Sequence, residues 1–163
     1  MKTPYALRKI TPLNRKKIDP AKFVFTGKVL QQETDIQLFR YNKTECTEDN
    51  AVHADHIPPM DGKDFMHWLN VYGLSDAQTI ESICKRLNIH SLVIQDILDL
   101  NQRAKFQEFD GFSFLTIKSI LPTEKEVVSE QISFVFGPSH LVSFQEKKAD
   151  YFDHLRTRLR EDK

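Results

Sequence analysis

The feature that most constrains the fold is a short run in the C-terminal half of the chain. In residues 132–136 (Ile-Ser-Phe-Val-Phe), apolar side chains stand at successive positions, 134–136, and not only at alternate ones. Such a strand is typical of a sheet that is buried on both faces. The sequence therefore predicts an α/β protein in which helices cover both sides of a central sheet.

Other segments supply the rest of such a fold. Strand-forming residues between turn signals predict strands at residues 22–29, 35–41, 67–71, 106–109, 112–121, 127–136 and 140–145, the first two joined as a hairpin, with a polar loop over 42–64. A capping box from Ser75 to Gln78 predicts a helix that runs to Leu87. Two further helices are expected over 91–100 and 150–160, with the apolar side chains inward (Leu92, Val93, Ile97 and Leu100; Phe152, Leu155 and Leu159).

The N-terminal segment differs from the rest in charge. Residues 1–22 hold seven basic side chains against one acidic side chain, Asp19, and Pro4, Pro12 and Pro20 interrupt any helix there. We therefore expect a basic, flexible leader over residues 1–21 and one folded domain over residues 22–163. The last helix ends in charged residues with no glycine or proline stop, which suggests that the chain is cut within a longer protein.

Composition excludes several classes of function. The five glycines are never closer than eleven residues, so a Gly-rich phosphate loop and a G-x-S-x-G nucleophile turn are both absent. Basic and acidic side chains balance at 23 each, which argues against a nucleic-acid partner. Two cysteines, Cys46 and Cys84, suit a reducing compartment rather than a disulfide scaffold. With no apolar run long enough for a membrane helix, the chain itself is expected to be soluble.

No grouping of residues predicts catalysis. His53, Asp55 and His56 form the most metal-like local cluster, but zinc requires three or four rigidly held ligands, so a solvated loop is the better interpretation. The remaining histidines stand singly, and His90 lies where a helix begins, which favours capping or packing. The chain is therefore not predicted to be an enzyme.

Two acidic residues on the second helix suggest a different chemistry. Asp96 and Asp99 are three residues apart beside Gln95, and their carboxylates are the kind of oxygen ligand that Mg²⁺ prefers. From spacing alone, a solvated helix face is the better interpretation of these two residues.

Several stretches together resemble the cytoplasmic N-terminal domain of the CorA family of magnesium and cobalt transport proteins. They recur in the family's order from about residue 22 to the end of the chain: F-T-G-K at 25–28, W-L-N-V with Gly73-Leu74 at 68–74, I-H-S-L-V-I-Q-D-I-L at 89–98, Q-R-A-K at 102–105, S-E-Q-I-S at 129–133, F-Q-E at 144–146, and a closing stretch with Asp150, Phe152, Arg156 and Arg158.

The resemblance implies a fold, a location and an assembly. The fold would be an α/β/α sandwich with a central mixed, largely antiparallel sheet, lying at the cytoplasmic side of the inner membrane. The full protein would be a homopentamer anchored by stalk and membrane helices that this chain lacks, and the domain would sense divalent cations to gate the pore.

The resemblance also implies one site residue. In the family, the aspartate of the E-D-I-L stretch binds a regulatory divalent cation between neighbouring subunits, and here that position is Asp96. Weakly bound Mg²⁺ is the expected ion, with Co²⁺ or another divalent cation as possible substitutes. Gln95 replaces the family's acidic neighbour and removes one carboxylate, and the partner acid of Asp96 would lie outside this chain.

Two alternatives remain open at this point. Zinc-transporting relatives share the domain, and nothing in this segment identifies the transported ion. A stand-alone soluble binding module with no membrane partner is the second alternative.

Overall fold

The computed structural model describes residues 22–27, 33–60, 62, 64–122, 127–148 and 150–161, and the side chains of all of these except residues 121, 122, 127, 128 and 150. The basic leader expected over residues 1–21 lies outside the described residues. That segment, and the domain boundary placed after it, therefore stay predictions.

A seven-stranded sheet forms the centre of the fold, in the order β2-β1-β3-β7-β6-β5-β4. Five of its strand pairs are antiparallel, and the pair β3–β7 is parallel. This confirms the mixed, largely antiparallel sheet. The strands are β1 (Asp35–Tyr41), β2 (Cys46–Asp49), β3 (Met66–Tyr72), β4 (Lys105–Phe109), β5 (Phe112–Pro122), β6 (Val127–Phe136) and β7 (His140–Gln145).

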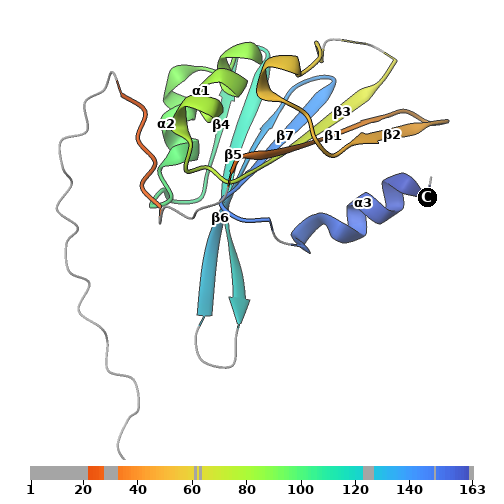
Figure 1. Cartoon of the computed structure of the whole chain (residues 1–163). Coiled ribbons are helices and arrows are strands. Elements are labelled where there is room, and N and C mark those ends of the chain that lie inside the picture. The colour runs from red at the N-terminus through yellow and green to blue at the C-terminus, as the bar shows by residue number, and fades with distance from the viewer. Residues whose placement is uncertain are drawn as a thin grey trace, which may run out of the picture.

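Two helices, α1 (Ala77–Arg86) and α2 (Ser91–Leu98), cover one face of the sheet (Figure 1). Their buried side chains and those of the sheet form one core, which includes Ile83, Ile97, Leu69 and Phe144. Each helix has a side-chain cap: the Asp76 carboxylate accepts hydrogen bonds from two backbone N–H groups of α1, and His90 Nδ1 accepts from Leu92 N–H at 3.2 Å. The capping role expected of His90 is therefore confirmed, whereas α1 begins one residue later than the Ser75 capping box predicts.

The third helix, α3 (Asp153–Arg160), lies on the opposite side of the sheet, after a 3₁₀ turn at Asp150–Phe152 (Figure 1). Phe152 packs edge-on against Trp68 and Phe134, with ring centroids 5.6 and 5.9 Å apart. Arg156 donates a hydrogen bond to the Tyr72 hydroxyl at 2.9 Å. Helices on both faces confirm the α/β/α sandwich.

The side chains that α3 turns toward the sheet differ from the prediction. Leu155, expected to face inward, is 47% exposed, whereas Arg156 is only 7% exposed. The reason is the surface that α3 meets: Tyr72 offers its hydroxyl there, and the long Arg156 side chain reaches it while burying its apolar stem.

A chain of buried polar groups crosses the same face of the sheet. Trp68 Nε1 donates to Ser143 Oγ at 3.1 Å, Ser143 Oγ donates to Asn70 Oδ1, and Asn70 Nδ2 donates to Gln37 Oε1 at 3.4 Å. Asn70 and Ser143 are fully buried. A buried polar group costs free energy unless it is hydrogen-bonded. Trp68 and Asn70, two residues apart on the same face of β3, meet this requirement by sharing Ser143 as a hydrogen-bond partner.

Three local predictions are wrong. Residues 22–27 form no strand, because their backbone groups bond to α2 rather than to β1. The expected loop over 42–64 contains strand β2. Leu92 is 66% exposed, because the core face of α2 is formed by Val93, Ile94, Ile97 and Leu98.

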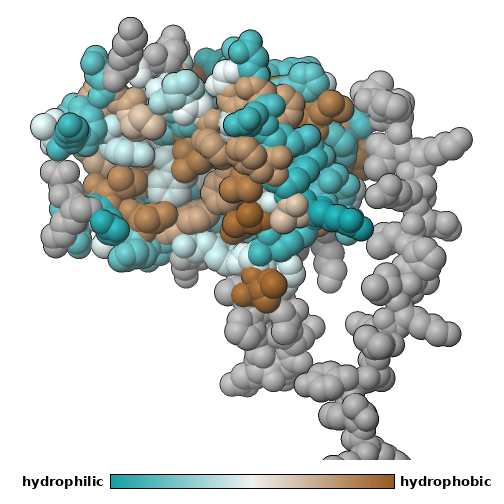
Figure 2. Space-filling view, turned by 180° about the vertical axis from the view of Figure 1, so that it is seen from behind, coloured by the Kyte–Doolittle hydropathy of each residue, from teal (hydrophilic) through white to brown (hydrophobic). Residues whose placement is uncertain are grey.

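Some large apolar side chains remain at the surface, among them Phe106 on β4 and Ile117 and Ile120 on β5. The rear view of the molecule shows apolar atoms gathered near its middle and bordered by polar ones (Figure 2). Among the described residues, no helix has the length and apolarity needed to cross a membrane.

The buried polar chain generates a stability prediction. Asn70→Ala should lower the free energy of unfolding by about 1–3 kcal/mol, because it removes the acceptor of the Ser143 hydroxyl proton and the donor to Gln37 Oε1 in the interior. Urea unfolding followed by tryptophan fluorescence measures the change. Gln107→Ala, at an exposed amide on β4, serves as the control and should change stability by less than about 0.5 kcal/mol. Equal effects of the two substitutions would contradict this role of Asn70.

Candidate functional site

Asp96 lies near the C-terminal end of α2, and its side chain is 16% exposed. Its Oδ2 atom forms an ion pair with Lys105 Nζ at 2.5 Å. Lys105 is the first residue of β4, the strand at the edge of the sheet. The carboxylate that the sequence singles out is therefore partly buried and already paired with a cationic side chain.

Two side chains from the sheet hold the end of α2 in place. Gln131 Nε2 donates to the backbone carbonyls of Asp96 at 3.3 Å and Asp99 at 3.2 Å. Lys118 Nζ donates to the Leu100 carbonyl at 2.5 Å and to Gln131 Oε1 at 3.0 Å. Helix ends leave carbonyls without partners within the helix, and these bonds supply them here.

The Lys118 ammonium lies in a partly buried position. Burial lowers the pKa of Lys118, while the nearby carboxylates of Asp99 and Glu146 act in the opposite direction. Lys118 thus donates hydrogen bonds to a backbone carbonyl and an amide oxygen at the helix end. Lys105, by contrast, forms an ion pair with the Asp96 carboxylate.

Residues 22–27 lie along α2 and are tied to it by both backbone and side chains. Val24 N–H donates to Gln95 Oε1 at 3.4 Å, and Gln95 Nε2 donates to the Val24 carbonyl at 3.3 Å. Thr26 N–H donates to the Leu98 carbonyl at 3.0 Å. An amide suits this position because it both accepts and donates, which a carboxylate cannot do.

Asp99 has a structural role. Its Oδ1 accepts hydrogen bonds from the Thr26 hydroxyl at 2.9 Å and from Asn101 N–H at 3.1 Å, and its Oδ2 accepts from Gln102 Nε2 at 3.0 Å. Both oxygens are therefore in use within the chain. Asp99 directly follows the last residue of α2, and of these two aspartates Asp96 is the one whose carboxylate forms an ion pair.

Asp96 offers one carboxylate, a kind of oxygen ligand that Mg²⁺ prefers. The described residues hold no group of three or more histidine, cysteine or acidic side chains placed to share a metal ion. Mg²⁺ is commonly held by one or two carboxylates and keeps several of its waters. One carboxylate is compatible with such a hydrated ion, and Asp96 as its ligand stays a prediction.

The loop histidines do not form a metal site in the described part of the chain. His53 Nδ1 lies 3.5 Å from Asp55 Oδ2, with both side chains 71% exposed, and it accepts a hydrogen bond from Asp55 N–H. His56 lies beside His53 with ring centroids 5.7 Å apart. This arrangement agrees with the expected solvated loop.

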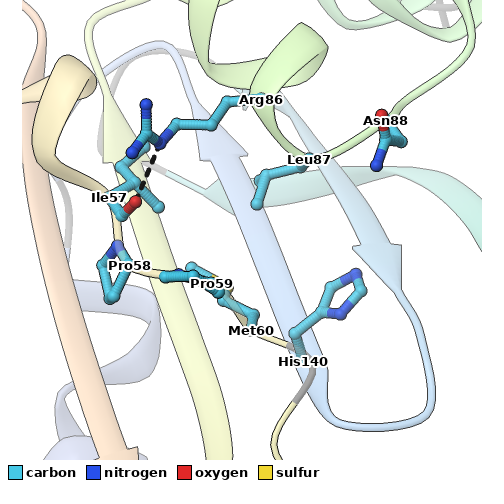
Figure 3. A pocket seen from close by; sticks show the side chains of 8 residues that line it. All are labelled: Ile57, Pro58, Pro59, Met60, Arg86, Leu87, Asn88 and His140. Atoms are coloured by element: carbon cyan, nitrogen blue, oxygen red, sulfur yellow. Dashed lines mark hydrogen bonds between the residues drawn. The ribbon is translucent and has the colours of Figure 1, made fainter.

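A cavity of about 340 Å³ lies elsewhere in the molecule (Figure 3). It is bordered by residues 57–60, by the end of α1 and by the start of β7. Arg86 Nε donates to the Ile57 carbonyl at its rim, at 2.8 Å, and His140 points into it. Burial and the neighbouring His67 lower the pKa of His140. Asp96 is not among the residues that line this cavity.

Sequence reasoning missed three side chains of the site. Lys105 ends the Q-R-A-K stretch, and Gln131 lies in the S-E-Q-I-S stretch, yet neither spacing nor composition pairs them with α2. Lys118 lies in none of the family stretches. All three contacts join the end of α2 to strands, so they become visible only when the sheet register is known.

Comparison with known proteins identifies the family. The family model of the CorA-like Mg²⁺ transporter proteins matches residues 63–163, which is more than half of the chain. The chain belongs to the CorA-like family. This confirms the resemblance found in the sequence motifs, and the family is one of transporters rather than enzymes.

Relatives and solved structures agree with this assignment. The chain is 28% identical over 148 residues to the cobalt/magnesium transport protein CorA of Thermotoga maritima, covering 90% of this chain and 42% of that protein. The complete CorA magnesium transporter of Methanocaldococcus jannaschii has the same fold, with a TM-score of 0.55 and 13% identity over 74% of this chain and 35% of that one. The ZntB cytoplasmic domain of Vibrio parahaemolyticus gives a TM-score of 0.60 and 17% identity over 81% of this chain and 52% of that one. The chain thus spans less than half of its CorA relatives.

The two hydrogen bonds of Gln95 generate a prediction about residues 22–27. Gln95→Glu should loosen this segment from α2, because a carboxylate cannot donate to the Val24 carbonyl. Amide hydrogen exchange should become about fivefold faster at Thr26, because a lost hydrogen bond of about 1 kcal/mol lowers the free energy that holds the segment. Gln78→Glu, at an exposed position of α1, is the matched control. Unchanged exchange at Thr26 would show that Gln95 does not hold the segment.

Proposed function

We propose that this chain is the cytoplasmic regulatory domain of a CorA-type Mg²⁺/Co²⁺ transport channel, in which it senses divalent cations and thereby gates the pore. The observation that carries the proposal is the family match over residues 63–163. The sandwich fold, which the chain shares with a complete CorA magnesium transporter, supports it. In this proposal the full protein is a homopentamer, joined to the inner membrane by helices that follow the region described here.

The proposed sensor residue is Asp96, with weakly bound Mg²⁺ as its regulatory ion and Co²⁺ as a substitute. Two features support the choice: the position of Asp96 within the family stretch and the chemistry of its carboxylate. Because one carboxylate is half a site, a neighbouring subunit would supply the second acid.

The regulatory effect follows from electrostatics. Two carboxylates at a subunit interface repel each other unless a cation lies between them, so Mg²⁺ would favour the closed, symmetric ring. At a free Mg²⁺ concentration equal to Kd, each site would contribute RT ln 2, which is about 0.4 kcal/mol. Five sites would together contribute about 2 kcal/mol, enough to shift a two-state gate about 30-fold. Five weakly binding sites are therefore enough to regulate the gate.

Limited proteolysis of the assembled full-length protein tests the assignment of Asp96. With Mg²⁺ at ten times its Kd, cleavage of the wild-type protein should become at least about tenfold slower, the factor that one site alone contributes, because the bound ion stabilises the closed state. Asp96→Asn keeps the shape of the side chain and should abolish this protection. Asp110→Asn, in the exposed β4–β5 turn, should leave it intact. Full protection of the Asp96→Asn variant would refute the site.

A zinc-transporting function is the second candidate. The ZntB cytoplasmic domain shares this fold, with a TM-score of 0.60. A larger rise in melting temperature with Zn²⁺ than with Mg²⁺, lost on Asp96→Asn, would support the zinc alternative. A larger rise with Mg²⁺ would support the magnesium channel.

A further inference from the structure

The ion pair between Asp96 and Lys105 differs from the other lysine ion pairs in the described part of the chain. The side chain of Lys105 is 29% exposed, whereas those of Lys85 and Lys148, which pair with Glu81 and Asp35, are 67% and 63% exposed. Pairs at the surface contribute little because water and salt screen them. The Lys85–Glu81 pair has the same 2.5 Å distance, so it is the reduced exposure of the Asp96–Lys105 pair that makes it the stronger contact.

The fold holds Lys105 in position to make this contact. Lys105 pairs with Thr116 of β5, which places it on the sheet face that α2 covers. Its ammonium lies 5.8 Å from the ring centroid of Phe114, a fully buried side chain on the same face. The β4–β5 register therefore directs the ammonium to the end of α2.

We propose that Lys105 is a built-in competitor for the divalent cation at Asp96. The proposal rests on the proposed cation-sensing role of Asp96 and describes how that site is regulated. An aspartate and a lysine in contact have no net charge, so the pair attracts a divalent cation far less than a free carboxylate does. Gln95 beside it is neutral, and the oxygens of Asp99 hold Thr26, Asn101 and Gln102. A cation must displace the ammonium to bind, and Lys105 therefore raises the cation concentration at which the site fills.

Displacement of Lys105 also has a structural consequence. The ion pair joins the end of α2 to the first residue of β4, and β4 is bonded on one side only, to β5. The bonds from Gln131 and Lys118 to the helix end come from β6 and β5 and do not involve Lys105. Filling the site therefore releases the start of the edge strand from α2 while the helix end stays attached to the sheet. Cation binding thus makes the start of β4 more mobile, because the ion pair that holds it to α2 is lost.

Paramagnetic NMR on the 163-residue chain tests the proposal with Mn²⁺ as the probe. Mn²⁺ bound at Asp96 broadens the amide signals of residues near it, in 93–98 and 104–107. Lys105→Met keeps the apolar stem and removes the charge, and should lower the Mn²⁺ concentration for half-broadening about threefold to tenfold, as expected for the loss of a half-buried ion pair. Lys105→Arg keeps the charge and should leave that concentration unchanged. Lys85→Met removes an exposed ion pair on α1 and should have no effect.

The outcomes separate the competitor role from the site itself. If Asp96→Asn abolishes the broadening but Lys105→Met does not tighten binding, Lys105 is no competitor and Asp96 remains a cation site. If Asp96→Asn leaves the broadening unchanged, the site is wrong, and the competitor role is overturned with it. If Lys105→Met tightens binding and the double variant with Asp96→Asn loses it, the proposal is supported.

Discussion

The C-terminal end of α2 is the point on which the candidate site depends. Gln131 and Lys118 bond to its terminal carbonyls, and Thr26 N–H bonds to the Leu98 carbonyl. A helix that ends in the interior needs partners for these groups, and three separate parts of the chain provide them. Because the helix end is held in this way, Asp96 is fixed within reach of Lys105 on β4. The acidic group proposed to sense cations thus lies on a rigid support, and its pairing partner comes from the less constrained edge of the sheet.

The two faces of the sheet are built on different principles. The face under α1 and α2 is an apolar core, whereas the face toward α3 combines aromatic contacts with the buried polar chain through Trp68, Asn70 and Ser143. A polar network of this kind specifies one register, because a slip of one residue would leave each member without its partner. α3 is joined to this side through Arg156 and through Arg160, which pairs with Glu48 on β2. Ionic and aromatic contacts, more than apolar burial, therefore position the last helix.

Much of the fold could be predicted from the sequence, because strand and helix periodicity depends on local patterning. The strands of the C-terminal half are found within a residue or two of their expected bounds, and the helix cap at His90 was expected. Residues 22–27 alternate as a strand does, yet they bond to α2, since tertiary contacts override a short local preference. Tertiary contacts also explain why Leu92 points outward and Arg156 points inward, against the prediction from helical periodicity. Within the site, Asp96 was predicted from its position in the family stretch. Its ion pair with Lys105 could not be predicted, because it depends on the register of the sheet and periodicity gives no information about register.

The most direct test of this account is a crystal structure of the assembled full-length protein grown with Co²⁺ and measured at the cobalt absorption edge. The account predicts an anomalous peak at about 2.1 Å from an oxygen of Asp96, the distance at which Mg²⁺ holds its oxygen ligands, with the Lys105 ammonium turned away. An acid of the neighbouring subunit should lie on the other side of the ion. Saturating Co²⁺ bound elsewhere, with Asp96 still paired to Lys105, would contradict the account.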